Sequence, residues 1–456
     1  MYYQKIYSNI IYFNKYIKIN YTQPIYNKIS NYYYILKSTY FLYYCIKNDI
    51  HENKIIENLV DSIDNSGCLY IKFIQWILPR FDQLNVNDKL NKTLEKYYEK
   101  CNVHDLEYTL YKFKEDFKYD LYDKYEIIDI IGSGSVGQVY KIKEKSTENY
   151  LCLKILHPNI EKEYQICKNI FNFIYFFIDI KKYIPIYDFE NFFNGLKDQL
   201  NLNKEVNNIL EFKNIYKDDK LYLIPNIINF TENIIIMTYI ESENKDKLTN
   251  VKKIHVFMKL LLFIFNSSYY GICHGDLHIG NWGISNNKLI IYDFGYCLRF
   301  DRHNYVQIEG LLLNNNRIES FGNIIKYGCK LINKDPEFYQ NLFFESYHNN
   351  YGKENISMEE SNSHLYKFLI ENEIYISSEL FNTTLVSGNL EYLSDPSTIN
   401  AKDTDNCYFI IEELIDLCDA YDTFSEYKKH LCKNYQRKLD STILNLKKYE
   451  NLKHLI

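Results

Sequence analysis

One stretch, residues 274–295, constrains the fold more than any other part of the chain. It begins His-Gly-Asp-Leu-His-Ile-Gly-Asn, and Asp293 opens an Asp-Phe-Gly sequence after a short apolar run. Asp276 and Asn281 stand five positions apart, so a carboxylate can meet a substrate hydroxyl while Asn281 and Asp293 hold Mg²⁺. Phosphoryl transfer needs this combination of groups. The stretch therefore predicts the catalytic and metal-binding loop of a kinase-like phosphotransferase.

A glycine-rich segment lies between two strand-like runs. Residues 132–139 read Gly-Ser-Gly-Ser-Val-Gly-Gln-Val, which fits the pattern Gly-x-Gly-x-x-Gly-x-Val. Glycines there let backbone N–H groups approach phosphate oxygens. The strand–loop–strand setting argues against a dinucleotide fold, which needs a helix after the loop. An ordinary glycine hairpin turn is the alternative. The candidate nucleotide-binding positions are Gly132, Gly134, Ser135 and Gly137.

Lys154 lies within an apolar run, residues 150–156, that is predicted to be a strand. A lysine inside an apolar strand is costly unless it is paired. In a kinase such a lysine bridges the α- and β-phosphates of ATP and a helix carboxylate. Glu205, in a helical region predicted over residues 189–217, is the candidate partner. A lysine on an edge strand that points to water is the alternative.

The spacing of apolar residues changes along the chain. Residues 30–120 repeat at helical spacing, whereas 125–131, 138–143 and 150–156 alternate with the period of strands. Beyond residue 300, the sequence predicts helices separated by Asn/Ser-rich loops. These patterns predict an α+β chain with a protein-kinase-like two-lobe fold, an N-terminal helical extension and a mainly helical C-lobe.

Three structural units are expected. They are an N-terminal helical extension over residues 1–120, an N-lobe with the glycine-rich loop over 121–240, and a C-lobe with the catalytic loop and the last helices over 241–456. The polar stretch 241–253 is expected to cross between the lobes. The polar segments 354–363 and 393–406 are predicted to be loops.

Charge and cysteine content exclude several classes of protein. The formal net charge is −6, so no nucleic-acid partner is indicated. Eleven cysteines are scattered without metal-ligand spacing, which is typical of reduced thiols. No apolar run approaches the roughly 18–20 residues of a spanning helix. We therefore expect an intracellular protein, soluble or peripheral to a membrane. The basic, tyrosine-rich N-terminus allows peripheral contact with an anionic membrane as an alternative to a plain helical extension.

These motifs resemble those of the AarF/UbiB-type atypical kinases. Residues 274–281 are similar to that family's His-x-Asp-Pro-His-Pro-Gly-Asn, and residues 135–140 to its Ser-Ile-Gly-Gln-Val-Tyr. Gln138, after the last glycine, is more specific than the glycines themselves. Residues 154–160 are similar to the family's Val-Lys-Val-x-His-Pro-Gly-Ile, and residues 204–208 to its Arg-Glu-Ala-x-Asn. The chain looks like a divergent member, with the resemblance extending from about residue 60 to about residue 320.

The resemblance implies a kinase or ATPase that uses ATP and Mg²⁺. Lys154 and Glu205 would form the ion pair that orients ATP, Asp276 would be the catalytic aspartate, and Asn281 with Asp293 would bind Mg²⁺. The resemblance further implies a lipid-related or small-molecule acceptor, near isoprenoid-quinone or other membrane-lipid metabolism.

The chain departs from the family at the N-terminal helix that restricts access to the active site. The family's Lys-x-Gly-Gln falls at residues 72–75, with Ile in place of Gly, and its Glu-x-Asp pair appears as Gln199 and Asn201. An ion pair from Lys72 to a carboxylate at position 199 is therefore not available. The phosphate loop also has glycines where the family has alanines. We expect weaker restraint, so that deleting residues 1–118 changes the ATPase rate little.

Other classes of protein are alternatives. Small-molecule phosphotransferases of the aminoglycoside/choline type have a similar catalytic loop, although Gln138 and residues 72–75 favour the first family. A conventional protein kinase is disfavoured because no Ala-Pro-Glu follows Asp293 at activation-loop distance. A nucleotide-binding pseudokinase that acts as a scaffold is the non-enzymatic alternative.

Overall fold

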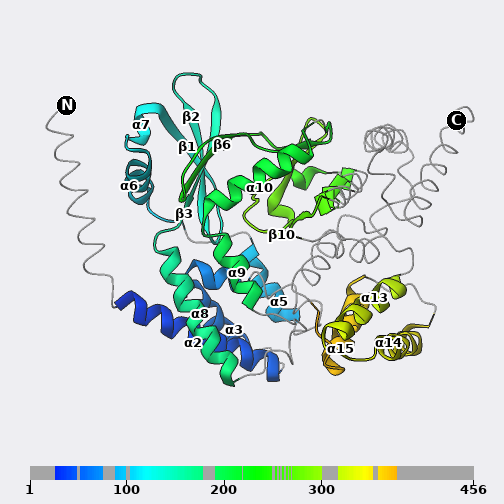
Figure 1. The fold of residues 1–456 in the computed structure, drawn as a ribbon. Helices are drawn as coiled ribbons and strands as arrows, with labels where there is room; N and C mark the ends of the chain where they lie inside the picture. Colours follow the sequence, from blue (N-terminus) through cyan, green and yellow to red (C-terminus); the bar gives the residue numbers. More distant parts are fainter. Residues whose placement is uncertain are drawn as a thin grey trace, which may run out of the picture. The chain divides into compact units, whose positions relative to one another are not determined.

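The computed structural model describes most of the chain between residues 26 and 376. The described residues are 26–48, 52–74, 88–98, 103–177, 190–217, 219–248, 271–299, 317–352 and 358–376, with part of 252–270. The chain forms two compact units (Figure 1); among the described residues, unit 1 has a five-stranded sheet and unit 2 has two smaller sheets. Unit 1 comprises residues 1–180, 200–202 and 227–239, and unit 2 comprises residues 181–199, 203–226 and 240–456.

Unit 1 begins with helices, as the apolar spacing predicted. In α3, the buried Ile56, Leu59 and Ile63 recur at helical intervals and form one apolar face. Residues 68–74 are also helical and pack on the helix that follows β3, where the rings of Phe73 and Phe171 lie 4.1 Å apart. The helices of unit 1 are α2 (Tyr26–Asn48), α3 (Asn53–Asp64), α5 (Asp88–Leu94), the 3-10 helix η1 (Glu95–Tyr98), α6 (Leu106–Phe117), α7 (Leu121–Lys124) and α8 (Ile160–Phe177).

The sheet of unit 1 is antiparallel, with the strand order β1-β2-β3-β6-β5. Lys154 pairs with Val139 on one side and Ile235 on the other, so it lies on the central strand and the edge-strand alternative is wrong. The three strands predicted before residue 157 are confirmed, each within two residues at its ends. The strands are β1 (Tyr125–Ser133), β2 (Gly137–Glu144), β3 (Tyr150–Leu156), β5 (Ile227–Phe230) and β6 (Ile234–Thr238).

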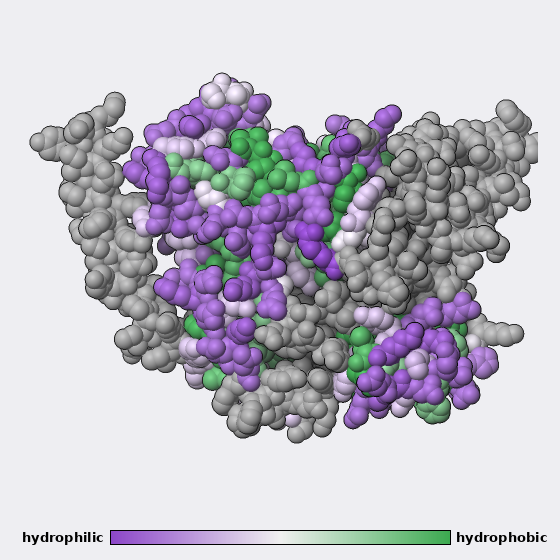
Figure 2. Space-filling view, viewed as in Figure 1, coloured by the Kyte–Doolittle hydropathy of each residue, from purple (hydrophilic) through white to green (hydrophobic). Residues whose placement is uncertain are grey.

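Helix α6 covers one face of this sheet. Its Phe113 is fully buried in a core with Tyr140 of β2 and Leu153 of β3. Ile127 of β1 packs against this core, and Ile128, which lies at a shift in the β1–β2 register, is 45% exposed. Figure 2 shows hydrophobic surface over the sheet among hydrophilic surroundings.

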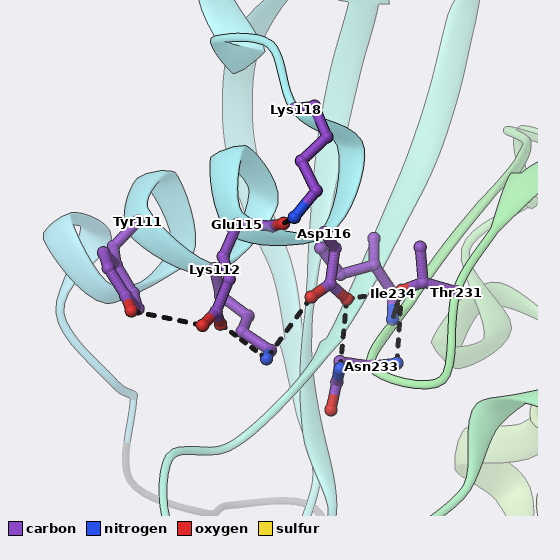
Figure 3. Close-up of polar contacts among 8 residues, drawn as sticks. All are labelled: Tyr111, Lys112, Glu115, Asp116, Lys118, Thr231, Asn233 and Ile234. Carbon is purple, nitrogen blue, oxygen red and sulfur yellow. Dashed lines mark hydrogen bonds and ion pairs between the residues drawn. The ribbon is translucent and has the colours of Figure 1, made fainter.

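A polar contact also holds α6 to the turn between β5 and β6 (Figure 3). The carboxylate of Asp116 accepts hydrogen bonds from Thr231 Oγ1 at 2.6 Å and Asn233 Nδ2 at 3.0 Å. Lys112 Nζ lies 3.3 Å from the same carboxylate. Helix α6 is therefore part of the packed sheet structure through both its apolar face and this carboxylate.

Unit 2 contains two small sheets and the helices around them. The helical region predicted over 189–217 is two helices, α9 (Glu190–Asp198) and α10 (Leu202–Ile215), separated at residues 199–201. One sheet has the order β4-β9-β8, and β4 runs parallel to β9. The other pairs β7 with β10. The strands are β4 (Tyr222–Leu223), β7 (Ile272–His274), β8 (Trp282–Ser285), β9 (Lys288–Ile291) and β10 (Cys297–Arg299).

In the described residues between 317 and 376, unit 2 has the helices α13 (Arg317–Leu331), α14 (Pro336–Tyr351) and α15 (Met358–Glu371). The loop predicted over 354–363 is wrong from Met358 onward, because α15 begins there. Ser361 is fully buried, and its hydroxyl lies 3.0 Å from that of Tyr347. The loop predicted at 393–406 lies outside the described residues. None of the described helices combines the length and the apolar character needed to cross a membrane.

Candidate active site

The pairing of β7 with β10 brings the two halves of the predicted catalytic loop together in unit 2. Cys297 lies opposite His274 in this pair, and the Gly275 N–H donates to the Tyr296 oxygen at 2.9 Å. The residues after β7 therefore lie beside those that follow Asp293.

His274 is a buried structural residue at the start of the loop. It is fully buried, its Nε2 atom lies 3.0 Å from the Tyr292 carbonyl oxygen, and its Nδ1 accepts from the Asp276 N–H at 3.2 Å. A carbonyl can only accept and an N–H can only donate, so the ring is neutral with its proton on Nε2. Burial lowers its pKa, which is consistent with that state.

Asn281 is fixed by the backbone of Asp276. Its Nδ2 donates to the Asp276 carbonyl oxygen at 2.7 Å, and the His278 N–H donates to the same oxygen at 3.1 Å. The amide is 8% exposed. With the nitrogen committed to the backbone, the amide oxygen Oδ1 is the atom suited to a cation.

Asp293 adopts a left-handed backbone conformation, with φ 48°. A residue with a Cβ atom is strained there by about 1–3 kcal/mol, and such strain is concentrated at functional sites. Its Oδ1 accepts from the Gly295 N–H at 3.2 Å, and the residue is exposed. A Cβ added to Gly295 would lie 3.1 Å from Asp293 Oδ1 and 3.4 Å from Glu205 Oε2. Glu205, which is 2% exposed, therefore lies close to the Asp-Phe-Gly sequence.

Two further residues hold α10 to this sequence: Asn208, which belongs to the 204–208 motif but had no predicted role, and Arg299, which belongs to no motif. Asn208 Nδ2 donates to the Phe294 carbonyl oxygen at 2.8 Å. Arg299 Nη2 donates to Asn208 Oδ1 at 2.9 Å and lies 2.9 Å from the Glu211 carboxylate. Asn208 stands three positions after Glu205, so both lie on one face of the helix. That spacing is the sequence feature from which the role of Asn208 follows.

The glycine-rich loop belongs to unit 1, and its glycines are not equivalent. A Cβ added to Gly137 would lie 2.5 Å from the Ile155 oxygen, so no side chain fits there. A Cβ on Gly132 would meet nothing within 4 Å, and one on Gly134 would meet only the Gly137 oxygen, at 3.7 Å. The first two glycines therefore border open space, whereas Ser135 is buried at 4% exposure.

The structure groups the predicted site residues within their units. Asp276, Asn281, Asp293 and Glu205 lie in unit 2, and Lys154 lies with the glycine-rich loop in unit 1. Lys154 is 7% exposed. Its ion pair with Glu205 would join the two units and stays a prediction.

The donor set in unit 2 is compatible with magnesium. Among the described residues no group of three or more His, Cys, Asp and Glu side chains is arranged to hold a metal ion. Magnesium does not require such a group, because it is commonly bound by one or two carboxylates, substrate phosphates and water. The Asp293 carboxylate and the Asn281 amide oxygen fit that pattern.

A cavity of about 440 Å³ lies beside the Asp-Phe-Gly sequence, within unit 2. Lys204 and Asn207 of α10 line it together with Gly295 and Tyr296. Its volume is in the range of small-molecule sites.

Helices around a small, mostly antiparallel sheet, a glycine-rich strand turn and the loop of unit 2 define a kinase-like domain of α+β class. Residues 96–317, slightly under half of the chain, match the family model for the ABC1 atypical kinase-like domain, which supports the atypical kinase family. No curated protein matches the chain. A solved structure of an Rv3197–erythromycin complex from Mycobacterium tuberculosis is 13% identical, with 64% of this chain and 84% of that chain covered; its TM-score of 0.38 is too low to support any conclusion.

Proposed function

We propose that this chain is an ATP-binding, Mg²⁺-dependent atypical kinase or ATPase of the AarF/UbiB type. The observation that carries the proposal is the conformation of Asp293. A strained, exposed carboxylate stands directly after a buried strand, beside Glu205 and next to the loop that holds Asp276. Strain of this kind persists where the geometry of a functional group requires it.

Each residue has a role in this proposal. Asp276 accepts the proton of the attacking hydroxyl or water, and Lys154 contacts the phosphates with Glu205 as its partner. The N–H groups around Gly132 and Gly134 face the phosphate oxygens. The Asp293 carboxylate and the amide oxygen of Asn281 would hold Mg²⁺, which neutralises the phosphate charge when bound.

The proposal is tested by Mg²⁺·ATP binding and hydrolysis. We expect Mg²⁺·ATP to raise the melting temperature, and Asp293→Asn to abolish that shift. Asp276→Asn should keep binding but lower hydrolysis by about 10²–10⁴-fold, the usual contribution of a general base. Glu345→Gln, on the exposed surface of α14, is the control and should behave as the parent. Binding without any turnover in the parent would indicate a pseudokinase, and absence of binding would contradict the proposal.

The acceptor is proposed to be a small polar molecule or a lipid headgroup that enters the cavity beside Gly295. The lining by Lys204 and Asn207 supports a polar acceptor. Mass spectrometry after incubation with labelled ATP, with and without anionic liposomes, distinguishes the two sources of acceptor. Asn207→Ala should lower transfer to either acceptor while leaving ATP binding unchanged. Equal transfer by this variant would place the acceptor elsewhere.

A further inference from the structure

A chain of hydrogen-bonded groups lies directly behind the glycine-rich loop in unit 1. His157 Nε2 lies 2.8 Å from the Gly134 carbonyl oxygen, and His157 Nδ1 lies 2.8 Å from Nδ1 of His104. His104 Nε2 lies 2.8 Å from Thr109 Oγ1. Because His157 follows β3 and His104 precedes α6, the chain links the loop to the start of α6.

The series of hydrogen bonds continues to Tyr140 and Gln138 of β2 and then returns to His104. Thr109 Oγ1 lies 2.8 Å from Tyr140 Oη, which accepts from Gln138 Nε2 at 2.5 Å. Gln138 Oε1 accepts from the backbone N–H of His104 at 2.9 Å. Gln138 and Thr109 are fully buried and Tyr140 is 1% exposed, so water does not substitute for these partners.

The direction of each hydrogen bond follows from the two ends of the chain. The backbone N–H of His104 can only donate, so Gln138 turns its oxygen to it and its NH₂ group to Tyr140. Tyr140 must then donate to Thr109. The proton of the Thr109 hydroxyl needs an acceptor in turn, and His104 Nε2 provides it. In a neutral His104 ring the proton is therefore on Nδ1.

The hydrogen bond from His157 to Gly134, at the other end of the series, fixes the tautomer of His157. The Gly134 carbonyl can only accept, so His157 carries a proton on Nε2 and, when neutral, a lone pair on Nδ1. The Nδ1–H of His104 thus faces the lone pair of His157. Donor meets acceptor at every contact in the chain, and both rings are neutral.

Protonation of His157 breaks this order. Its new Nδ1–H would face the Nδ1–H of His104 at 2.8 Å. Reversing the chain, with donation from His104 Nε2 to Thr109, does not help, because either the Thr109 or the Tyr140 hydroxyl proton is then left without an acceptor. A buried donor left without an acceptor is costly, so the neutral pair is strongly favoured.

The surroundings agree with a neutral pair. Burial lowers the pKa of both rings, and the pKa of His104, which His157 lowers further, falls to about 3. Among the described residues, the titratable groups that face the pair are the phenols Tyr140 and Tyr108, and the Tyr108 ring centre lies 5.0 Å from that of His104.

Charged side chains near the pair face elsewhere. Lys154 lies opposite Val139 on β2, so it is on the other side of the sheet from Gln138 and Tyr140. The charged residues at the starts of α6 and α8 are exposed, namely Asp105, Glu107, Glu161 and Lys162.

We propose that His157 and Gln138 are positioning residues that hold the glycine-rich loop through this network of neutral, directed hydrogen bonds. By anchoring the Gly134 carbonyl on one side, His157 turns the N–H of the same trans peptide, that of Ser135, to the opposite side. Fixing this peptide fixes the backbone of the loop, which the proposed function places against the phosphate oxygens. Protonation of the network releases the loop and weakens nucleotide binding.

The network is tested without nucleotide by ¹⁵N NMR of labelled histidines in the full chain. We expect the proton on Nδ1 of His104 and on Nε2 of His157. Gln138→Glu supplies an acceptor to Tyr140 and so permits the reversed chain. This variant should move the His104 proton to Nε2 and raise the pKa of His157. Unchanged tautomers and an unchanged pKa in Gln138→Glu would overturn the proposed directions.

The effect on the loop rests on the proposed function, because its readout is Mg²⁺·ATP affinity. His157→Leu should weaken binding about tenfold, whereas His157→Gln, which keeps a donor to Gly134, should stay within about threefold of the parent. His364→Gln, in α15, is the matched control for loss of a partly buried histidine. Equal affinity in His157→Leu and the parent would overturn the positioning role.

The pH dependence of Mg²⁺·ATP affinity tests the network separately from the proposed function. It uses no variant that loses the hydrogen bond from His157 to Gly134. ATP phosphate itself titrates near pH 6, so the comparison is between the parent and Gln138→Glu at each pH. We expect the parent to lose affinity on acidification more steeply than Gln138→Glu. Parallel profiles would overturn the proposal. A parent that binds no nucleotide at any pH would contradict the proposed function. The histidine tautomers measured by NMR would still test the proposed directions of the hydrogen bonds.

Discussion

At the scale of single residues, the glycines of the phosphate loop give a matched pair of substitutions. Gly137→Ala places a Cβ 2.5 Å from the Ile155 oxygen, whereas Gly132→Ala meets nothing within 4 Å. We expect Gly137→Ala to lower the free energy of unfolding by about 1–3 kcal/mol, the usual cost of overpacking. Gly132→Ala should change it by less than about 0.5 kcal/mol. Chemical denaturation measures both, and equal losses would contradict the packing argument.

Glu163 of α8 gives a prediction of pH dependence. Burial raises the pKa of its carboxyl to about 7, although hydrogen bonds from the Leu69 and Cys68 N–H groups lower it in part. The folded state therefore binds more protons than the unfolded state between about pH 4.5 and 7, and this group's contribution to stability is lost as pH rises through that window.

Glu163→Gln removes this titration. Relative to the parent, its free energy of unfolding should rise by about 1–3 kcal/mol between pH 5 and pH 8. Glu161→Gln, exposed on the same helix, is the control and should track the parent. A difference between Glu163→Gln and the parent that is the same at both pH values would show an ordinary carboxyl pKa.

Motif spacing in the sequence identified the motif residues but not the residues outside the motifs that contact them. Gln138 stood out from its neighbours, yet His104, 34 positions earlier, carries no motif and meets it through the fold. Likewise the position of Lys154 on a central strand depends on β6, which the chain forms some 80 residues later.

At the scale of elements, the docking of α6 rests on the carboxylate of Asp116. Asp116→Ala leaves the Thr231 hydroxyl and the Asn233 amide without this acceptor. We expect a loss of about 1–3 kcal/mol in the free energy of unfolding. Glu115→Ala, next to it and more exposed, loses a surface ion pair with Lys112 and should cost less than about 1 kcal/mol. Thermal denaturation of both variants measures the two losses of stability. Similar losses would mean that the apolar face of α6, and not the Asp116 carboxylate, holds this helix to the sheet.

Strands were predicted closely and helix boundaries less so, for a physical reason. In unit 1, β2 alternates buried and partly exposed residues from Gln138 to Lys143, as a strand with one buried face does, and β3 is a short apolar run that is buried along most of its length. The break between α9 and α10 was missed because Leu200 and Leu202 are both buried and continue the apolar pattern while the chain turns. The start of α15 was missed because Ser361 and Ser363 are polar in sequence but buried in the fold.

At the scale of the whole molecule, the N-terminal region is not removable as one piece. Deleting residues 1–118 would remove Phe113 from the core of the sheet and Asp116 from its contacts with the β5–β6 turn. It would also remove Phe73 from the surface of α8. We expect this truncation to abolish cooperative unfolding, so its ATPase rate would say nothing about restraint by the N-terminal helix.

A point substitution tests that restraint in the intact protein. Lys72 is partly buried in the helical residues 68–74. In the AarF/UbiB-type kinases that the sequence resembles, a carboxylate stands at the position of Gln199, whose Nε2 here donates to the Gly195 oxygen of the preceding helix, α9, at 3.3 Å. Because position 199 has no negative charge to offer, Lys72→Ala should change the ATPase rate by less than about twofold, the scale of a surface charge contact. Unfolding by denaturant checks that the variant keeps the parent's stability. A large rise in ATPase rate with unchanged stability would show that the N-terminal helix restrains this chain through Lys72 despite the altered partner.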